Sequence, residues 1–295
     1  MSSEKKSLVF FGSGPVAAAS LAKLRDSFLI EAIITKATTE QEMRTACPDA
    51  PIYLVSTKSD VDLITAEHSF QSKLGVLIDF GIIVSQKVID SFPKGIVNSH
   101  FSLLPELRGA DPISFAILEG HEKTGVSLML LVEAMDEGPL LAAHEVSLNG
   151  SETTPELTDT LINVSYELLR KNLPLYLSGD LEAQNQSGTA SYTRKLTKAD
   201  GKIDWSKPAT QIEREIRAYT GWPKSTAHLG EIECVVLAAK VVPNQGASGT
   251  LFIQEKQLGV NCGHAALLLS QLKPAGKKAM DSQAFLAGYR NKLGL

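Results

Sequence analysis

The sequence predicts an α/β fold: an open, mostly parallel sheet with helices, followed by a small β-barrel. Up to about residue 150, short apolar runs alternate with stretches of helical periodicity. Continuous apolar runs are typical of strands covered on both faces, as in parallel sheets, and their alternation with helices favours right-handed crossovers. The C-terminal part instead contains short strand-like runs at regular spacing, which indicates a small barrel.

The first part contains five runs that we expect to be strands and two stretches that we expect to be helices. Most of the runs are bounded by Gly, Pro or polar residues, which commonly end strands. The expected strands are Leu8–Phe11, Leu29–Thr35, Gly75–Asp79, Gly95–Asn98 and Val126–Leu131, and the expected helices are Val16–Arg25 and Pro112–Glu119.

A long amphipathic stretch, Thr153–Leu177, ends the first part. Apolar residues recur there at helical spacing, and Pro155 lies where a helix begins. The stretch at 183–199 is rich in Gln, Ser, Thr and Gly, which is typical of a linker. We therefore expect a first domain over 1–183, a linker over 184–202 and a second domain over 203–295.

The second domain is expected to contain one helix, Pro208–Tyr219, followed by strands. Short strands joined by tight turns are a feature of small antiparallel barrels. The expected strands are Ser225–Leu229, Glu233–Val242, Gly249–Ile253, Leu258–Asn261 and Ala266–Leu272.

Composition argues against several classes of protein. The chain has 295 residues, 43% of them hydrophobic, and no apolar run approaches the roughly 18 residues of a membrane-spanning helix. The N-terminal MSSEKKSLVFF has too short an apolar core for a secretory signal. The three cysteines form no C-x-x-C pair, so that neither a zinc site nor a redox pair is indicated. We expect a cytoplasmic protein that contacts no membrane and holds no metal.

Charge is unevenly distributed along the chain. The whole chain has a formal charge of −4, yet residues 184–295 contain 15 Lys and Arg against 8 Asp and Glu, a local charge of +7. Residues 1–183 contain 14 basic against 25 acidic side chains, or −11. A basic part on an acidic body favours a polyanion contact by that part. The plainer interpretation is that the asymmetry only aids solubility.

The turn after the first expected strand matches a dinucleotide-binding pattern. Gly12–Ala17 fits G-x-G-x-x-A, and Glu31 lies near the position of a ribose-binding acid. Pro15, however, lacks a backbone N–H where phosphate-binding donors are needed, and Glu31 begins an apolar run rather than ending one. We therefore favour a tight strand-to-helix turn over a nucleotide site.

The segment after the fourth expected strand has polar side chains in a pattern that suits chemistry. Asn98 and His100 are two residues apart, so an extended backbone places both side chains on one face. In an open α/β sheet, ligands bind beyond the carboxyl ends of the strands. Asp136 follows the next expected strand in a Gly-Pro turn, and it reaches the same crevice if the two strands are neighbours.

An Asn, a His and an Asp at one crevice suit acyl transfer to an amine. The amide can donate to a developing oxyanion, the imidazole can transfer protons, and the carboxylate can orient the ring. No Ser or Cys nucleophile is required if the amine attacks directly. Alternatively, Asn98 is a turn residue, His100 a hydrogen-bonded structural group and Asp136 a turn or helix cap.

These three residues lie in a longer motif that resembles the 10-formyltetrahydrofolate-dependent formyltransferases. The stretch Asn98–Pro112 reads N-x-H-x-S-L-L-P-x-x-R-G-x-x-P, and it is followed by T-G-V at 124–126 and D-E-G at 136–138. The combination is long, ordered and specific.

The resemblance implies a role for each part of the motif. Asn98, His100 and Asp136 are the implied catalytic residues, and 10-formyltetrahydrofolate is the implied formyl donor, with no metal. The implied folate-binding residues are Ser102, Leu103, Leu104 and Pro105.

The second half of the chain is similar to the methionyl-tRNA formyltransferases within that family. The similar stretches are YTRKL at 192–196, IDW at 203–205, IRA at 216–218, GWP at 221–223 and LKPAGKKAM at 272–280. The resemblance implies a Rossmann-like catalytic domain, an OB-like barrel that contacts tRNA, initiator methionyl-tRNA as the formyl acceptor, and a monomer. The alternative is a related transferase that formylates another amine, such as an amino-sugar nucleotide.

The chain departs from the family pattern after the second expected strand. Members often carry a Gly- and Lys/Arg-rich loop there, near the acceptor end of the tRNA. Residues 36–44 instead read KATTEQEMR, in which Lys36 and Arg44 are offset by two acids. This departure puts the usual acceptor-stem contact in question.

Overall fold

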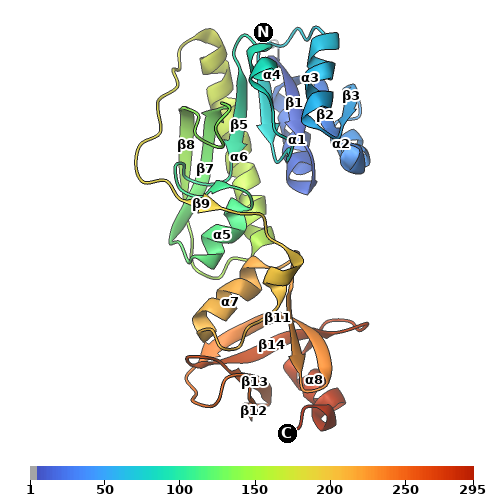
Figure 1. Ribbon diagram of the computed structural model, residues 1–295, viewed down its shortest axis with the longest axis vertical. Helices are drawn as coiled ribbons and strands as arrows, with labels where there is room; N and C mark the ends of the chain where they lie inside the picture. Colours follow the sequence, from blue (N-terminus) through green and yellow to red (C-terminus); the bar gives the residue numbers. More distant parts are fainter. Residues whose placement is uncertain (1–4) are drawn as a thin grey trace. The chain divides into compact units, whose positions relative to one another are not determined.

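The computed structural model describes residues 5–295, so the MSSE that begins the N-terminal segment considered above lies outside the described residues. The chain divides into two compact units (Figure 1). Unit 1 comprises the chain up to Pro112 with Lys123–Ser147 and Thr158–Thr193, and unit 2 comprises Ile113–Glu122, Leu148–Leu157 and Arg194–Leu295.

Unit 1 is built on a seven-stranded sheet with the order β3-β2-β1-β4-β5-β7-β8. The first five strands in this order are parallel, whereas β7 is antiparallel to β5 and β8 is antiparallel to β7. The strands are β1 (Ser7–Gly12), β2 (Leu29–Lys36), β3 (Ile52–Val55), β4 (Gly75–Ile78), β5 (Ile96–His100), β7 (Lys123–Leu130) and β8 (Leu140–Ser147). A separate parallel pair joins β6 (Arg108–Gly109) to β9 (Tyr192–Thr193).

Helices cover both faces of this sheet. The helices up to residue 178 are α1 (Pro15–Ser27), α2 (Glu40–Ala46), α3 (Lys58–Glu67), α4 (Gln86–Asp90), α5 (Pro112–Leu118) and α6 (Thr154–Ser178), with a 3-10 turn at Ala37–Thr39. On one face, Val61 of α3 and Val88 of α4 pack against Phe11 of β1 and Ile34 of β2. Phe80 and Phe92 meet Phe11 edge to face, each with ring centroids 5.8 Å apart.

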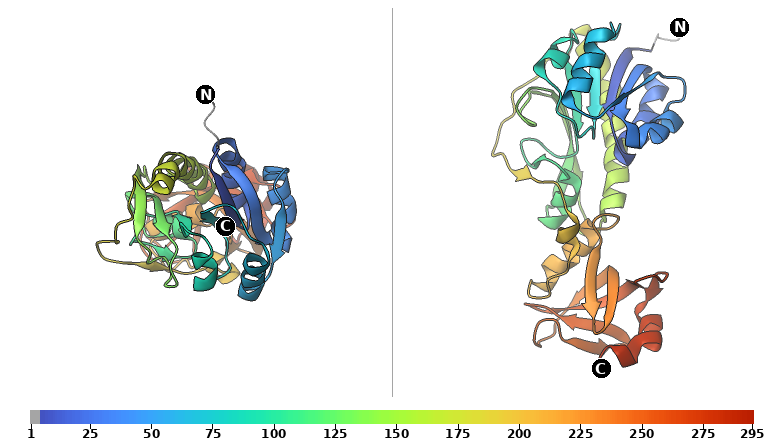
Figure 2. Two further views of the ribbon diagram at one scale, coloured as in Figure 1. Left: turned by 90° about the horizontal axis from the view of Figure 1, so that it is seen from above. Right: turned by 45° about the vertical axis from the view of Figure 1, so that its right-hand side comes forward.

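The long helix α6 (yellow-green in Figure 2) runs along the opposite face. Its Ser165 hydroxyl is hydrogen-bonded to the hydroxyl of Ser99 in β5, at 2.7 Å, and both are buried. Because successive side chains of a strand alternate between faces, Asn98 and His100 point away from α6. The prediction that these two residues share a face is therefore confirmed.

The predicted strands of the first part are all present, but the sequence did not predict two further strands of the seven-stranded sheet, β3 and β8. Both are edge strands of the sheet. All positions of the strand β8 but one are half-buried or exposed, and β3 is only four residues long. The sequence of β3, IYLV, is an apolar run but a short one, and β8 continues from LLAA into the more polar HEVS. An edge strand does not need a long continuous apolar run, so neither strand stood out in the sequence.

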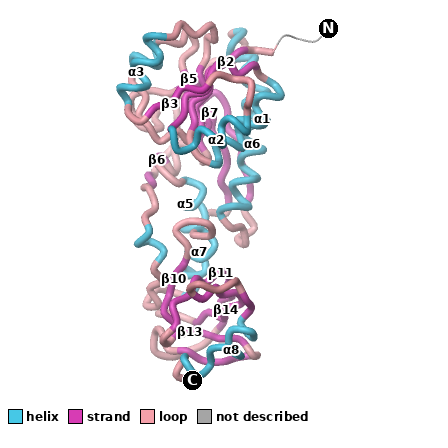
Figure 3. The backbone as a smooth tube through the Cα atoms, turned by 90° about the vertical axis from the view of Figure 1, so that its right-hand side faces the viewer, coloured by secondary structure: helices cyan, strands magenta, loops and turns pink. Residues whose placement is uncertain are grey.

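Unit 2 contains an antiparallel sheet, whose strands are drawn in magenta near the C-terminus in Figure 3. Its main order is β10-β11-β14-β13-β12, and β15 pairs with β14 off this order. Its strands are β10 (Ser225–Leu229), β11 (Ile232–Val242), β12 (Leu251–Gln254), β13 (Gln257–Asn261), β14 (Ala266–Pro274) and β15 (Met280–Asp281). Its helical elements include α7 (Ala209–Ala218), α8 (Ser282–Tyr289) and 3-10 turns at Lys198–Gly201 and Arg290–Lys292.

The sheet of unit 2 closes on a core of its own. Ile212 and Ile216 of α7, Phe285 of α8 and leucines of β13 and β14 are buried together. The predicted fold class was an open, mostly parallel α/β sheet followed by a small OB-like barrel. It is confirmed by the mostly parallel sheet of unit 1 and by the small antiparallel sheet domain of unit 2. Among residues 5–295, no helix is long and apolar enough to cross a membrane.

Candidate active site

The carboxyl end of β5 carries the first two predicted site residues. Asn98 and His100 are each 7% exposed and lie on the same face of the strand. In the neighbouring antiparallel strand β7, they pair with Met129 and Ser127. The side chains are thus held on a buried central strand, which restricts their positions more than a surface loop would.

Asp136 reaches the same place from the turn after β7. That turn is brought to β5 because the two strands are neighbours, as the sequence argument required. One carboxylate oxygen, Oδ1, accepts a hydrogen bond from Asn98 Nδ2 at 3.4 Å. The other, Oδ2, lies 3.8 Å from His100 Nδ1 and accepts a hydrogen bond from Gly109 N at 2.7 Å. The structure therefore brings Asn98, His100 and Asp136 together.

The two nitrogens of His100 have different environments. Nε2 is hydrogen-bonded to the carbonyl oxygen of Leu107 at 2.9 Å. A carbonyl oxygen can only accept, so Nε2 carries a proton and serves as the donor in this bond. Nδ1 faces Asp136 at a distance beyond a direct hydrogen bond. Nδ1 is therefore the nitrogen that can exchange a proton with a bound molecule.

The predicted folate loop, Ser102–Pro105, is tied down by hydrogen bonds of its own. Ser102 is fully buried, and its hydroxyl donates to Glu106 O at 2.6 Å. Ser127 Oγ donates to Ser102 O at 2.8 Å and accepts from Leu104 N at 3.0 Å. Leu103 alone of the four is half-buried rather than buried. The loop thus presents an apolar side chain, while its polar groups fix its shape.

Sequence analysis missed the groups that support these residues. Leu107, through its carbonyl, and Gly109, through its N–H, act by backbone atoms, which leave no side-chain signal. Gln186 lies in the predicted linker, where its amide donates to Asp136 O at 2.7 Å and to Gly138 O at 2.8 Å. Its polar, low-complexity surroundings in the sequence concealed this role.

The glycine-rich turn after β1 is occupied by the protein's own groups. Ser13 N donates to Asp79 O at 2.9 Å, and Ser13 Oγ donates to Phe80 O. An Asp79 carboxylate oxygen would lie 3.0 Å from a Cβ at Gly14, so negative charge stands where a phosphate would bind. Glu31 accepts backbone N–H bonds from residues 71 and 72, at 2.7 Å each. These contacts favour the tight-turn interpretation.

Residues 36–44 form the 3-10 turn and most of α2 instead of an open basic loop. Arg44 pairs with Glu40 at 2.7 Å along one face of this helix. Lys36 Nζ donates to Gly81 O at 3.2 Å. Both basic groups of the stretch are therefore engaged within the protein.

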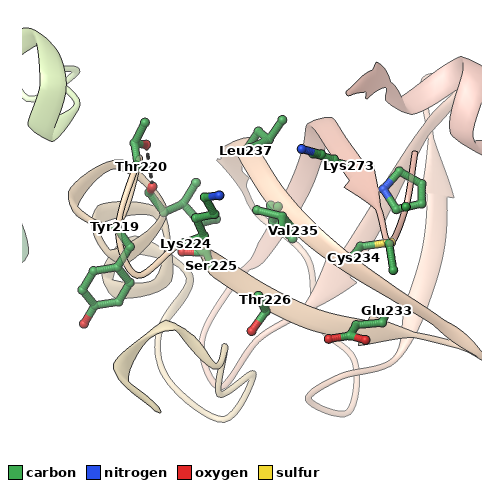
Figure 4. A pocket seen from close by; sticks show the side chains of 16 residues that line it. Tyr219, Thr220, Lys224, Ser225, Thr226, Glu233, Cys234, Val235, Leu237 and Lys273 are labelled. Carbon is green, nitrogen blue, oxygen red and sulfur yellow. Dashed lines mark hydrogen bonds between the residues drawn. The ribbon is translucent and has the colours of Figure 1, made fainter. Parts of the chain in front are cut away.

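Unit 2 contains a separate cavity of about 340 Å³ between the end of α7, β10, β11 and the end of β14 (Figure 4). Lys224, Lys273 and Glu233 are among its lining residues. Burial raises the pKa of Tyr219 to about 12 and the pKa of the Cys234 thiol to about 11. Both groups are thus neutral near pH 7, and two lysines outnumber one glutamate in the lining.

Among residues 5–295, no group of three or more His, Cys, Asp or Glu side chains is arranged to hold a metal ion. The three cysteines are buried and form no disulfide.

Comparison with protein families matches both halves of the chain. The model described as "Formyl transferase" matches residues 5–173, and the model described as "Formyl transferase, C-terminal domain" matches residues 195–290.

Curated relatives point the same way. The chain is 35% identical to the methionyl-tRNA formyltransferase of Herpetosiphon aurantiacus over 245 residues, which is 82% of this chain and 80% of that protein. It is 32% identical to the methionyl-tRNA formyltransferase of Roseiflexus sp. over 300 residues, covering 96% of this chain and 92% of that one.

Solved structures share the fold at low identity. HypX from Aquifex aeolicus in complex with tetrahydrofolic acid has a TM-score of 0.66 at 14% identity, over 97% of this chain and 48% of that chain. This chain thus spans about half of HypX. An N-formyltransferase from Helicobacter canadensis, in complex with folinic acid and dTDP-3-aminofucose, has a TM-score of 0.66 at 17% identity, over 90% of this chain and 99% of that chain.

Proposed function

This chain belongs to the formyl transferase family, and we propose that it transfers the formyl group of 10-formyltetrahydrofolate to the free amino group of initiator methionyl-tRNA. The observation that carries the proposal is the meeting of Asn98, His100 and Asp136 at the carboxyl end of β5. Relatives at 32–37% identity bearing the name methionyl-tRNA formyltransferase support the acceptor.

Each of the three residues has a role in the proposed reaction. Asn98 donates from Nδ2 to the formyl oxygen, which gains negative charge when the amine adds to the formyl carbon. His100 Nδ1 takes the proton that the attacking amine loses and delivers a proton to the departing N10 of the folate. Asp136 stabilises the protonated imidazole, with which it is aligned at 3.8 Å. Atoms balance, because one proton leaves the amine and one reaches N10.

The loop Ser102–Pro105 is the proposed contact for the folate, which supplies the activated formyl group. Leu103 is suited to lie against a flat apolar ring because its side chain is half-buried. Ser102, Leu104 and Pro105 are buried and maintain the shape of the loop.

Unit 2 contains the proposed contact for the tRNA. The cavity lysines, Lys224 and Lys273, lie close in sequence to the exposed Lys277 and Lys278 and to Trp222, which is 56% exposed. Lysine side chains can bind phosphates, and an exposed tryptophan can stack on bases. We propose a catalytic domain over 1–183, a linker over 184–202 and a tRNA-contacting domain over 203–295, in a monomeric cytoplasmic protein.

The test of the proposed function is a formyl-transfer assay with 10-formyltetrahydrofolate and two competing acceptors. We expect tetrahydrofolate release with charged initiator tRNA and none with an amino-sugar nucleotide. Turnover of the amino sugar alone would replace the proposed acceptor by the alternative one. Folate binding without release in the presence of either acceptor would mean a binding protein.

A salt series tests the tRNA contact in unit 2. Affinity for the tRNA should fall steeply with salt, because phosphate contacts release counterions. Lys273→Ala should weaken binding and reduce the slope of log affinity against log salt by about one. Lys87→Ala, on α4 of unit 1, is the charge-matched control and should leave the slope unchanged. Equal slopes for both variants would remove the cavity lysine from the contact.

A further inference from the structure

We propose that Gln186 is a positioning residue for Asp136, and that the segment 184–193 sets the geometry of the candidate active site. The proposal rests on the function proposed above. In the sequence, this segment looks like a linker, yet all of it belongs to unit 1. Its side chains contact the two loops that complete the site.

The Gln186 amide joins three groups beside the site. Its Nε2 donates to Asp136 O at 2.7 Å and to Gly138 O at 2.8 Å, so that one NH₂ group spans the turn. Its Oε1 accepts from Arg108 Nη2 at 2.8 Å. Arg108 Nη1 in turn pairs with Glu137 at 2.9 Å. Gln186 therefore binds the backbone of Asp136 and Gly138, and Arg108 binds the side chain of Glu137 between them.

The turn needs such support because its backbone is strained. Asp136 has a φ of 54°, in the left-handed region that non-glycine residues rarely adopt. A Cβ at Gly138 would meet Leu130 O at 1.7 Å, so the turn is pressed against β7. Strained conformations of this kind persist where neighbouring groups enforce them. The two bonds from Gln186 are well placed to enforce this one.

The same segment also holds the loop behind His100. Ser191 Oγ accepts from Leu107 N at 2.9 Å, and Leu107 O is the partner of His100 Nε2. Thr193 Oγ1 donates to Arg108 O at 3.0 Å, next to the β6–β9 pair. The segment 184–193 therefore contacts both the loop that binds the His100 imidazole and the turn that carries the Asp136 carboxylate.

Backbone bonds anchor the segment independently of Gln186. Gln184 N donates to Leu140 O at 2.8 Å, and Leu140 N donates to Gln184 O at 2.7 Å. Gln184 is exposed and enters these bonds through its backbone. Gln184 is therefore a matched control for Gln186, because the two glutamines are two residues apart and only Gln186 contacts the turn of Asp136 by its side chain.

The first test compares Gln186→Ala, Gln186→Glu and Gln184→Ala in formyl transfer to methionyl-tRNA. Gln186→Ala should lower kcat about tenfold, the effect of losing a hydrogen bond of ordinary strength, with the KM values and the melting temperature little changed. Gln186→Glu keeps the size but removes both donors, so it should be at least as slow. Gln184→Ala should match the wild type. A kcat for Gln186→Ala equal to that of Gln184→Ala would overturn the proposal.

A double-mutant cycle separates positioning of Asp136 from a general structural role. In single-turnover assays with enzyme in excess, Gln186→Ala should slow an Asp136→Asn background by much less than tenfold, because the group that it positions is already altered. The same tenfold loss in both backgrounds would refute the assignment. A wild-type protein that formylates neither acceptor would instead refute the proposed function, so the two failures are distinguishable.

A crystal structure of Gln186→Ala gives a readout that does not depend on activity. We expect the Asp136 carboxylate to move away from Asn98 and His100 while β5 and β7 stay in place. An unchanged carboxylate position would contradict the positioning role.

Discussion

The turn after β1 and the end of β5 lie at the carboxyl edge of the same sheet, but they differ in how far the protein's own groups occupy them. The turn after β1 is filled by the protein itself, because Ser13 and Gly14 lie against the backbone and carboxylate of Asp79. At the end of β5, three polar side chains face one another with separations of 3.4 Å and 3.8 Å, which leave their hydrogen-bonding capacity only partly used. The first turn is closed by internal contacts, whereas the second can still engage a ligand.

The difference shows what each kind of pattern reports. Glycines report a backbone shape, which a Rossmann-like sheet needs at its first turn whether or not a nucleotide binds. Asn98 and His100 instead predict a chemical role, because an amide and an imidazole two residues apart on a strand lie on the same face. A motif of side chains was therefore the better guide to the site than a motif of glycines.

The largest expected effect comes from His100→Ala, which removes the proposed proton-transfer group. Turnover with methionyl-tRNA should fall about 100-fold or more, the usual scale for general acid–base groups. The matched change in the other turn, Ser13→Ala, should leave turnover within about twofold, since that hydroxyl only bonds a backbone carbonyl. Both are measured by tetrahydrofolate release at saturating substrates.

Near-normal turnover of His100→Ala would remove the imidazole from the mechanism. A large loss for Ser13→Ala, with the melting temperature unchanged, would erase the distinction between the two turns.

The parts of the site on central strands were predictable from the sequence. The strand β5 begins with the apolar residues Ile96 and Val97 and continues directly into Asn98 and His100, so the place of these two polar residues at the end of a buried strand followed from the sequence. The place of Asp136 required the additional assumption that β5 and β7 are neighbours, which the strand pairing bears out. The antiparallel direction of that pair was not evident from an apolar pattern that is the same for both directions.

The groups that hold the site were not predictable in the same way. Leu107 and Gly109 use backbone atoms, and their positions depend on long-range loop contacts. Gln186 is 50 residues from Asp136 along the chain, in a stretch whose composition indicated a linker. Local composition does not report contacts of this range.

A smaller effect is expected from two glycine substitutions, one in the turn after β7 that carries Asp136 and one in the turn after β1. Gly138→Ala would place a Cβ 1.7 Å from Leu130 O, so the turn that carries Asp136 must shift, and kcat should fall about tenfold or more. Gly14→Ala is strained by its φ of 112° and ψ of 175°, which should cost about 1–3 kcal/mol of unfolding free energy with little change in kcat. Urea unfolding and steady-state kinetics on both variants separate the two effects. A loss of stability without a loss of kcat in Gly138→Ala would make the two turns alike.

The smallest expected effect is that of Glu31→Gln, which asks whether the turn after β1 has any ligand-binding partner at all. Its carboxylate accepts two backbone N–H bonds, from residues 71 and 72, and an amide can accept only one of them. The free energy of unfolding should therefore fall by about 1–2 kcal/mol, while kcat and the KM for the folate stay unchanged. If Glu31 bound a ribose instead, the wild type would show saturable binding of NAD by fluorescence titration, and Glu31→Gln would abolish that binding. Such a result would make the first turn a second ligand site and would end the contrast with β5.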